Sequence, residues 1–156
     1  MNIVKRRRAM IFSLFSLTST LALLSGCNTP PATRKVELTK RPTPSDAKNQ
    51  KEYRLDAAKH LYGLNSGHIF SGKLPPLLYA VGVVRVQIDA NGDLKDIDWM
   101  RKPAHAPEVI SEIENRIRKA SPFPAAPHLG DVIYTETWLW HKSGQFQLDT
   151  LSEGQT

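Results

Sequence analysis

Hydrophobic residues recur with two different periods along the chain, and these periods predict its secondary structure. Tyr53, Ala57, Leu61 and Leu64 lie three or four positions apart, which is the period of an amphipathic helix. Asn65-Ser66-Gly67 follows this stripe and predicts the end of the helix. The first predicted element is therefore a helix that begins at about residue 52.

Alternation of apolar and polar side chains characterises the next segment. Leu78–Asp89 shows the period of two that is typical of a half-buried strand. Asn91-Gly92 follows, and this pair favours the positive φ of a tight hairpin turn. The returning strand breaks strict alternation once, between Leu94 and Ile97. A hairpin with a β-bulge at that point is therefore predicted.

The remaining elements follow in the order helix, then strand. Pro107 suits a first helical turn and Ser121-Pro122-Phe123-Pro124 ends a helix, so a second helix is predicted between them. Val132–His141 predicts a third strand, and Gly144–Leu151 is the candidate for a short additional edge. The order α-β-β-α-β predicts an α+β fold in one domain.

Aromatic side chains gather on one face of the predicted third strand. Tyr134, Trp138 and Trp140 share this face, whereas Leu139 takes the other. One of the two faces must pack on the helices. Two interpretations are open: the aromatics belong to the core, or they form an exposed surface on which a peptide docks.

The first residues of the chain follow a different pattern. Lys5 to Arg8 are basic, residues 9–24 are largely apolar, and Leu24-Ser25-Gly26-Cys27 resembles the lipobox of bacterial lipoproteins. The apolar stretch is shorter than the roughly 20 residues that span a bilayer. Residues 1–26 are therefore predicted to be a cleaved lipoprotein signal peptide, with Cys27 as the lipidation site. An uncleaved membrane helix and an unmodified Cys27 are the alternatives.

Residues 27–52 have the composition of a tether. They contain four prolines and few large apolar side chains, which predicts disorder. About 22 such residues reach about 75 Å when fully stretched. Asn28, rather than Asp, follows Cys27 and favours the outer membrane over the inner one. The predicted organisation is a signal peptide at 1–26, a lipidated Cys27 with its tether at 27–52, a domain at 53–151 and a frayed tail at 152–156.

Charge is distributed unevenly along the chain. The formal net charge of +6 divides into +4 for residues 1–26, +3 for residues 27–52 and −1 for residues 53–156. The predicted domain is therefore nearly neutral, and the composition gives no support for a nucleic-acid partner. Cys27 is the only cysteine, which excludes a disulfide within the chain.

Candidate catalytic and metal-binding groups are sparse. Asp89, Asp93, Asp96 and Asp98 crowd the hairpin, where an acid pair or a Ca²⁺ site is conceivable but solvated turn residues are the expected interpretation. The five histidines show no metal-ligand spacing. No glycine-rich phosphate loop is present in the sequence. We therefore expect no catalytic residues, no metal and no cofactor, and hence no enzyme.

The run Gly82–Trp99 combines a glycine, alternating valines, the turn residue Gly92 and apolar residues two, five and seven positions later. A helix closing on Ala120–Pro124 follows, and then the strand Val132–Trp140 with Ser143-Gly144 after it. Together these motifs resemble the C-terminal domain of the periplasmic energy transducer TonB and its relatives. The resemblance covers roughly residues 75–148.

This resemblance implies a three-stranded antiparallel sheet in the order second, first, third, with two helices on one face. It implies a binding module whose last strand is an open edge. In that family the open edge takes up an extended peptide from an outer-membrane receptor as an additional strand. The implied partner-binding residues are Thr135, Glu136, Thr137, Trp138, Leu139 and Trp140.

The leading hypothesis is a non-enzymatic, lipid-anchored protein of the bacterial cell envelope that faces the periplasm. It would contact the membrane through Cys27 and bind an envelope protein or receptor peptide by strand addition. One alternative is a TonB-family energy transducer acting in transport across the outer membrane, which requires an uncleaved inner-membrane helix. The other is a structural accessory lipoprotein of an envelope complex. Strand exchange at an open edge also predicts a homodimer as an option.

Overall fold

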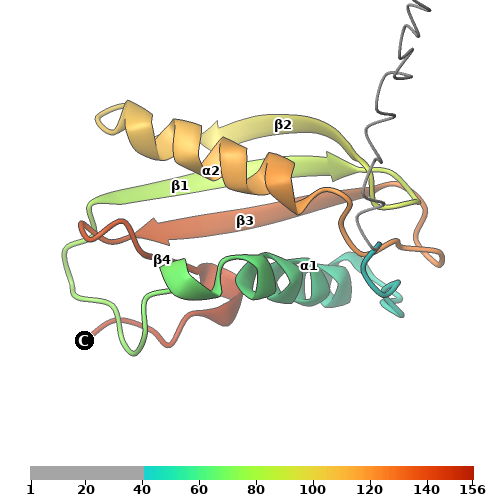
Figure 1. The fold of residues 1–156 in the computed structure, drawn as a ribbon, viewed down its shortest axis with the longest axis horizontal. Coiled ribbons are helices and arrows are strands. Elements are labelled where there is room, and N and C mark those ends of the chain that lie inside the picture. The colour runs from blue at the N-terminus through green and yellow to red at the C-terminus, as the bar shows by residue number, and fades with distance from the viewer. Residues whose placement is uncertain (1–40) are drawn as a thin grey trace, which may run out of the picture. The chain divides into compact units, whose positions relative to one another are not determined.

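A computed structural model describes residues 41–156 of the chain. The expected signal peptide, Cys27 and residues 27–40 of the expected tether lie outside the described residues. Within 41–156, helices and strands follow one another as predicted, with one strand added near the end (Figure 1). The elements are α1 (Gln50–Leu64), η1 (Ser66–His68), β1 (Ala80–Ile88), β2 (Leu94–Arg101), α2 (Pro107–Ala120), β3 (Val132–Trp140), β4 (Phe146–Leu148) and η2 (Asp149–Leu151).

The strands of the described part form one antiparallel sheet in the order β2-β1-β3-β4. The α+β class and the order of the first three strands are confirmed, but the predicted sheet of three strands is wrong because a fourth is present. β4 pairs with the end of β3, from Trp138 opposite Leu148 to Trp140 opposite Phe146. The segment Gly144–Leu151 thus supplies a strand of three residues.

The β1–β2 hairpin forms as the sequence predicts. Ile88 pairs with Leu94, whereas Gln87 pairs with Asp96, so one residue of β2 is left without a partner between them. This irregularity lies between Leu94 and Ile97 and confirms the predicted β-bulge. The turn itself is closed by a hydrogen bond of 3.0 Å from the Asp89 amide to the Asp93 carbonyl.

Gly92 in this turn has two independent reasons to be glycine. Its φ is +92°, a backbone conformation that other residues adopt only with strain. A Cβ atom at this position would also lie 2.0 Å from the carbonyl oxygen of Phe123. The Phe123 amide donates to the Gly92 carbonyl over 2.7 Å, so the turn is fastened to the segment that follows α2.

Replacing Gly92 with alanine is therefore expected to lower the free energy of unfolding by about 3 kcal/mol, because backbone strain and a steric clash add. Gly144→Ala is the matched control. Gly144 also has a positive φ, +83°, but no atom lies within 4 Å of the place that a Cβ would take, so about 1 kcal/mol is expected. Urea denaturation of both variants measures the difference. Equal losses of unfolding free energy in the two variants would show that the clash with Phe123 adds nothing to the backbone strain.

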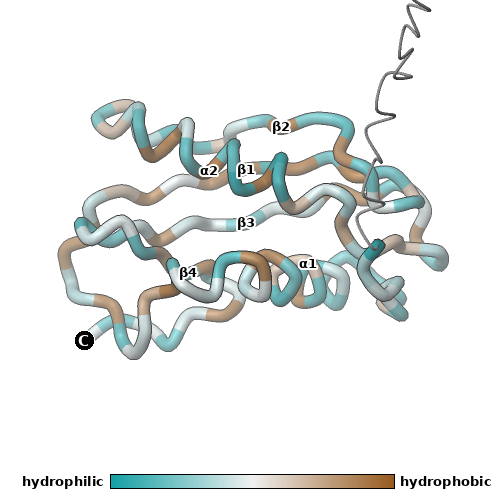
Figure 2. The backbone as a smooth tube through the Cα atoms, in the orientation of Figure 1, coloured by the Kyte–Doolittle hydropathy of each residue, from teal (hydrophilic) through white to brown (hydrophobic). Residues whose placement is uncertain are grey.

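Both helices lie on one face of the sheet (Figure 1). A single hydrophobic cluster joins Tyr53 and Leu61 of α1, Ile113 of α2, Val84 of β1 and Trp138 of β3. On β1 and β3 the buried residues alternate with more exposed ones, as half-buried strands require. Along α2, the buried hydrophobic residues Val109, Ile113 and Ile117 recur four positions apart, and Figure 2 shows hydrophobic and hydrophilic stretches along this helix.

The helix α1 begins earlier than expected, at Gln50, because Asn49 caps it. The Asn49 side chain accepts a hydrogen bond of 3.0 Å from the Glu52 amide, and the Glu52 carboxylate accepts one of 2.8 Å from the Lys48 amide. This reciprocal arrangement satisfies amides that a helix start leaves free. The bond from Lys48 is also the main cause that lowers the pKa of Glu52.

Residues 41–49, which the sequence assigns to the tether, lie against the domain. The Ser45 amide donates to the Ala125 carbonyl over 2.8 Å, and Ala47 is buried. Arg41 donates to the Asn91 carbonyl over 2.9 Å. Small side chains with backbone hydrogen bonds thus order a segment whose composition alone predicts disorder. We refer to residues 41–49 as the entry segment.

The tail is likewise held in place. The Leu74 amide donates to the Gly154 carbonyl over 2.9 Å, and the Thr156 amide donates to the Leu74 carbonyl over 3.0 Å. The expectation of a frayed tail at 152–156 therefore differs from the structure. The connector before β1 supplies the backbone partners, which periodicity in the tail could not reveal.

Candidate functional site

The edge of β3 is only partly covered by its neighbours. On one side β3 pairs with β1 along its whole length, from Val132 opposite Ile88 to Trp140 opposite Ala80. On the other side β4 pairs only with Trp138–Trp140. Within residues 41–156, Val132–Thr137 therefore has a strand partner on one side alone. We call this stretch the open segment of β3.

The direction of the backbone groups in the open segment follows from a hydrogen bond just past the end of β3. In antiparallel strands, successive residues direct their amide and carbonyl to opposite sides. The His141 amide donates to the Gln145 carbonyl on the β4 side, over 2.9 Å. Residues at odd positions of β3 therefore face that side, which places the backbone groups of Ile133, Thr135 and Thr137 on the open edge.

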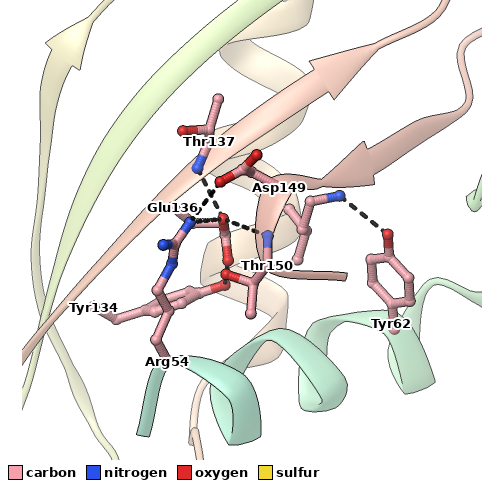
Figure 3. Close-up of polar contacts among 8 residues, drawn as sticks. Arg54, Tyr62, Tyr134, Glu136, Thr137, Asp149 and Thr150 are labelled. Carbon is pink, nitrogen blue, oxygen red and sulfur yellow. Dashed lines mark hydrogen bonds and ion pairs between the residues drawn. The ribbon is translucent and has the colours of Figure 1, made fainter. Parts of the chain in front are cut away.

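A buried carboxylate lies at the end of the open segment (Figure 3). Glu136 has no exposed surface. It accepts hydrogen bonds of 2.8 Å from Arg54, 3.0 Å from the Tyr134 hydroxyl and 2.9 Å from the Thr137 amide. The Thr150 amide of η2 adds a longer contact of 3.4 Å. The carboxylate thus occupies one of the three amides that the open edge presents.

This cluster links α1 to three elements near the end of the chain, β3, β4 and η2. Arg54 of α1 contacts both Glu136 of β3 and Asp149 of η2, the latter at 3.3 Å. Tyr62 of α1 accepts a hydrogen bond of 3.1 Å from the Leu148 amide of β4 (Figure 3). The charge of Glu136 is therefore compensated where it is buried, as a buried carboxylate requires. The cluster fixes the point at which β4 and η2 leave the edge of β3.

Burial has a clear effect on the neighbouring tyrosine. It raises the pKa of Tyr134 well above the ordinary value of 10.0, and the negative charge of Glu136 acts in the same direction. Tyr134 therefore remains a neutral hydrogen-bond donor to Glu136 at physiological pH. The group is thus part of the hydrogen-bonded cluster around Glu136.

The structure separates the six predicted partner-binding residues into two sets. The side chains of Glu136, Trp138 and Trp140 are buried on the helix face. Trp140 stacks on Phe146 with ring centroids 5.5 Å apart, and Trp138 lies 4.6 Å from the same ring. Of the two interpretations of the aromatic face, the core therefore holds. The other three predicted residues are half-buried on the opposite face: Thr135, Thr137 and Leu139.

The β2 strand forms the other free edge of the sheet. No strand of the described part pairs with its outer side. Its side chains include Lys95, Asp96 and Asp98, and its pairing with β1 is interrupted by register shifts. Charges and irregular register are features that protect an edge from added strands. The open segment of β3 is the better candidate.

The hairpin aspartates serve the turn. The Asp89 carboxylate accepts hydrogen bonds of 2.9 Å from the amides of both Asn91 and Asp93. Within residues 41–156, no three or more His, Cys, Asp or Glu side chains are grouped so that they could hold a metal ion. In the same range, no helix is both long and apolar enough to cross a membrane. Cys27 lies outside the described residues.

No protein-family model, curated protein or solved structure matches this chain. The Glu136 cluster was not among the features predicted from the sequence. The available signal was an acid within the alternating apolar series of Tyr134, Glu136 and Trp138, which places a carboxylate on the buried face.

Proposed function

We propose that this chain is a non-enzymatic lipoprotein of the bacterial cell envelope whose domain binds an extended segment of a partner protein. The segment adds as a strand to the open segment of β3, Val132–Thr137. The observation that carries this proposal is the incomplete cover of β3, because β4 pairs with Trp138–Trp140 alone. The partner's backbone would satisfy amides and carbonyls that the edge leaves free.

The surroundings of the open segment suit a short peptide. Ile133 is 53% exposed and Thr135 half-buried, so both side chains can contact the alternate residues of an added strand. The Glu136 carboxylate already holds the Thr137 amide, and η2 lies beside it. The added strand therefore ends at this cluster, which limits its register and its length.

We propose Cys27 as the lipid-attachment site because Leu24-Ser25-Gly26-Cys27 resembles a lipobox. Attachment there places the domain in the periplasm, with Asn28 favouring the outer membrane. The near-neutral charge of residues 53–156 agrees with a protein partner and gives no support for nucleic acid.

Thr135→Pro tests strand addition. Proline removes the Thr135 amide that faces the open edge, but β1 loses no hydrogen bond, so the domain is expected to fold. A photo-reactive amino acid in place of Ile133 would capture the partner in the native envelope. We expect Thr135→Pro to abolish the crosslinked species and the control Thr135→Val to keep it. A partner captured equally by both variants would instead favour the structural accessory hypothesis.

Cys27→Ser tests the anchor separately. Cells grown with radiolabelled palmitate should label the natural chain and leave the Cys27→Ser variant unlabelled. The processed chain should also migrate faster than an uncleaved precursor, because residues 1–26 are removed. An unlabelled full-length chain in the inner membrane would contradict the anchor and support the energy-transducer alternative.

A further inference from the structure

A cleft of about 450 Å³ lies at the end of the sheet where β1 begins and β3 ends. The start of α2 lies at the same end, and the β1–β2 hairpin at the opposite one (Figure 1). Tyr79 and Trp140 supply aromatic walls, Glu108 and Glu112 supply carboxylates from α2, and Lys142 completes the rim. This cleft is separate from the open segment of β3.

Two exposed hydrophobic residues, Leu77 and Tyr79, lie in the segment that leads into β1. Leu77 is 88% exposed and Tyr79 is 45% exposed, which makes Leu77 the most exposed large hydrophobic side chain of the described residues. Tyr79 is held in position by its hydroxyl, which donates to Glu108 over 2.6 Å, and by its carbonyl, which lies 2.9 Å from Nε2 of His105. An exposed aliphatic residue beside an oriented aromatic ring is a surface on which a partner can bury apolar groups.

The two carboxylates are one helical turn apart and have capacity for a further cation. Glu108 is bound to the Tyr79 hydroxyl through one oxygen, Oε1. Glu112 binds Arg116 at 2.6 Å, also through Oε1. A carboxylate can accept several hydrogen bonds, so these contacts leave each group able to accept a further one. The hydrogen bond from the Tyr79 hydroxyl is also the main cause that lowers the pKa of Glu108, so the Glu108 carboxylate stays charged at neutral pH.

Arg116 shows how two residues of this lining already bind a cation. The guanidinium of Arg116 lies 5.8 Å from the ring centroid of Trp140 while it pairs with Glu112. Glu112 and Trp140, which both line the cleft, thus contact one cation already, the buried side chain of Arg116. The same combination of groups faces the open side, where Glu108 and Tyr79 are exposed to solvent.

We propose that this cleft receives an arginine or lysine side chain of a partner protein, next to an apolar residue that packs on Leu77 and Tyr79. Glu108 is the carboxylate that complements the incoming cation, because Glu112 is already paired with Arg116, and Lys142 is the one cation of the lining that opposes it. This site is independent of strand addition at β3. It predicts a basic residue beside an apolar one in the sequence that the domain recognises.

The test uses the full chain in micelles of an uncharged detergent and a fluorescently labelled peptide, acetyl-Gly-Leu-Arg-Leu-Gly-amide, with fluorescence anisotropy as the readout. A second peptide carries citrulline, which has the shape of arginine without its charge. We expect saturable binding of the arginine peptide that weakens with salt, and weaker binding of the citrulline peptide. Equal affinity for the two peptides, or no saturable binding, would overturn the proposal.

Variants locate the site. Glu108→Gln is expected to weaken binding of the arginine peptide roughly fivefold, as for a solvent-exposed ion pair. Lys142→Gln is expected to strengthen it, because it removes the opposing charge. Asp96→Asn is the matched control, since Asp96 pairs with Gln87 far along β1 from the cleft. An unchanged affinity of Glu108→Gln, or an equal loss with Asp96→Asn, would contradict the site.

Thr135→Pro separates this inference from the proposed strand addition. The variant should bind the arginine peptide as the natural chain does, whether or not it loses the partner captured from position 133. Loss of peptide binding in Thr135→Pro, with the fold intact by circular dichroism, would show that the peptide binds at β3 rather than in the cleft.

Discussion

Replacing Trp138 with alanine is expected to lower the free energy of unfolding by about 4 kcal/mol. Trp138 has no exposed surface and is the largest of the fully buried side chains in the described residues. Its ring packs on Phe146 of β4, so the substitution leaves a cavity between β3 and the strand that covers part of its edge. Thermal and urea denaturation measure the loss.

Trp138→Phe is the matched control. The indole Nε1 of Trp138 is buried without a hydrogen-bond partner among the described residues. Replacement by phenylalanine therefore reduces the side-chain volume but removes no hydrogen bond. About 1 kcal/mol is expected, well below the loss for alanine. A Trp138→Ala chain of natural stability that fails to bind its partner would contradict the core position and revive the docking interpretation of the aromatic face.

Glu136→Ala is expected to cost about 3 kcal/mol, because several donors lose their acceptor together. The Tyr134 hydroxyl would be left unsatisfied in a buried site, and the half-buried Thr137 amide would lose its acceptor. Arg54 is 36% exposed at its side chain and can regain water, which keeps the cost at the lower end for a broken buried pair. Chemical denaturation near neutral pH measures the change.

Glu108→Gln serves as the control for the loss of a carboxylate. Glu108 lies at the surface, where water can replace a lost partner, so its substitution is expected to leave the free energy of unfolding nearly unchanged. Amide hydrogen exchange adds a local readout: in Glu136→Ala, the Thr137 amide should exchange faster. If Glu136→Ala were no more damaging than Glu108→Gln, the cluster would not be what holds η2 to β3.

The sequence predicted those parts of the fold that depend on local patterns. Asn91-Gly92 indicated the hairpin, the spacing of Leu94 and Ile97 indicated the bulge, and Pro107 is the first residue of α2. Each of these signals lies within a few residues of the structure that it determines. Local backbone preferences therefore suffice for them.

The remainder depends on contacts between distant segments. β4 has three residues, too few to show an alternation, and its place is set by β3 and by the Phe70 amide, which donates to the Phe146 carbonyl. The Glu136 cluster needs Arg54, which lies 82 residues earlier. The cleft near Tyr79 likewise combines residues from separate stretches of chain. No pattern within one stretch could place them together.

The entry segment also limits how far the domain can travel. Arg41 is bound at the hairpin end of the sheet, so the chain is attached to the domain there, well before residue 53. Thirteen residues lie between Cys27 and Arg41, and the fourteen Cα–Cα steps that join these two residues span at most about 50 Å. If Cys27 carries a lipid, the domain is confined to a thin layer beside one membrane. A partner must enter that layer, where confinement raises the effective concentration of the two molecules.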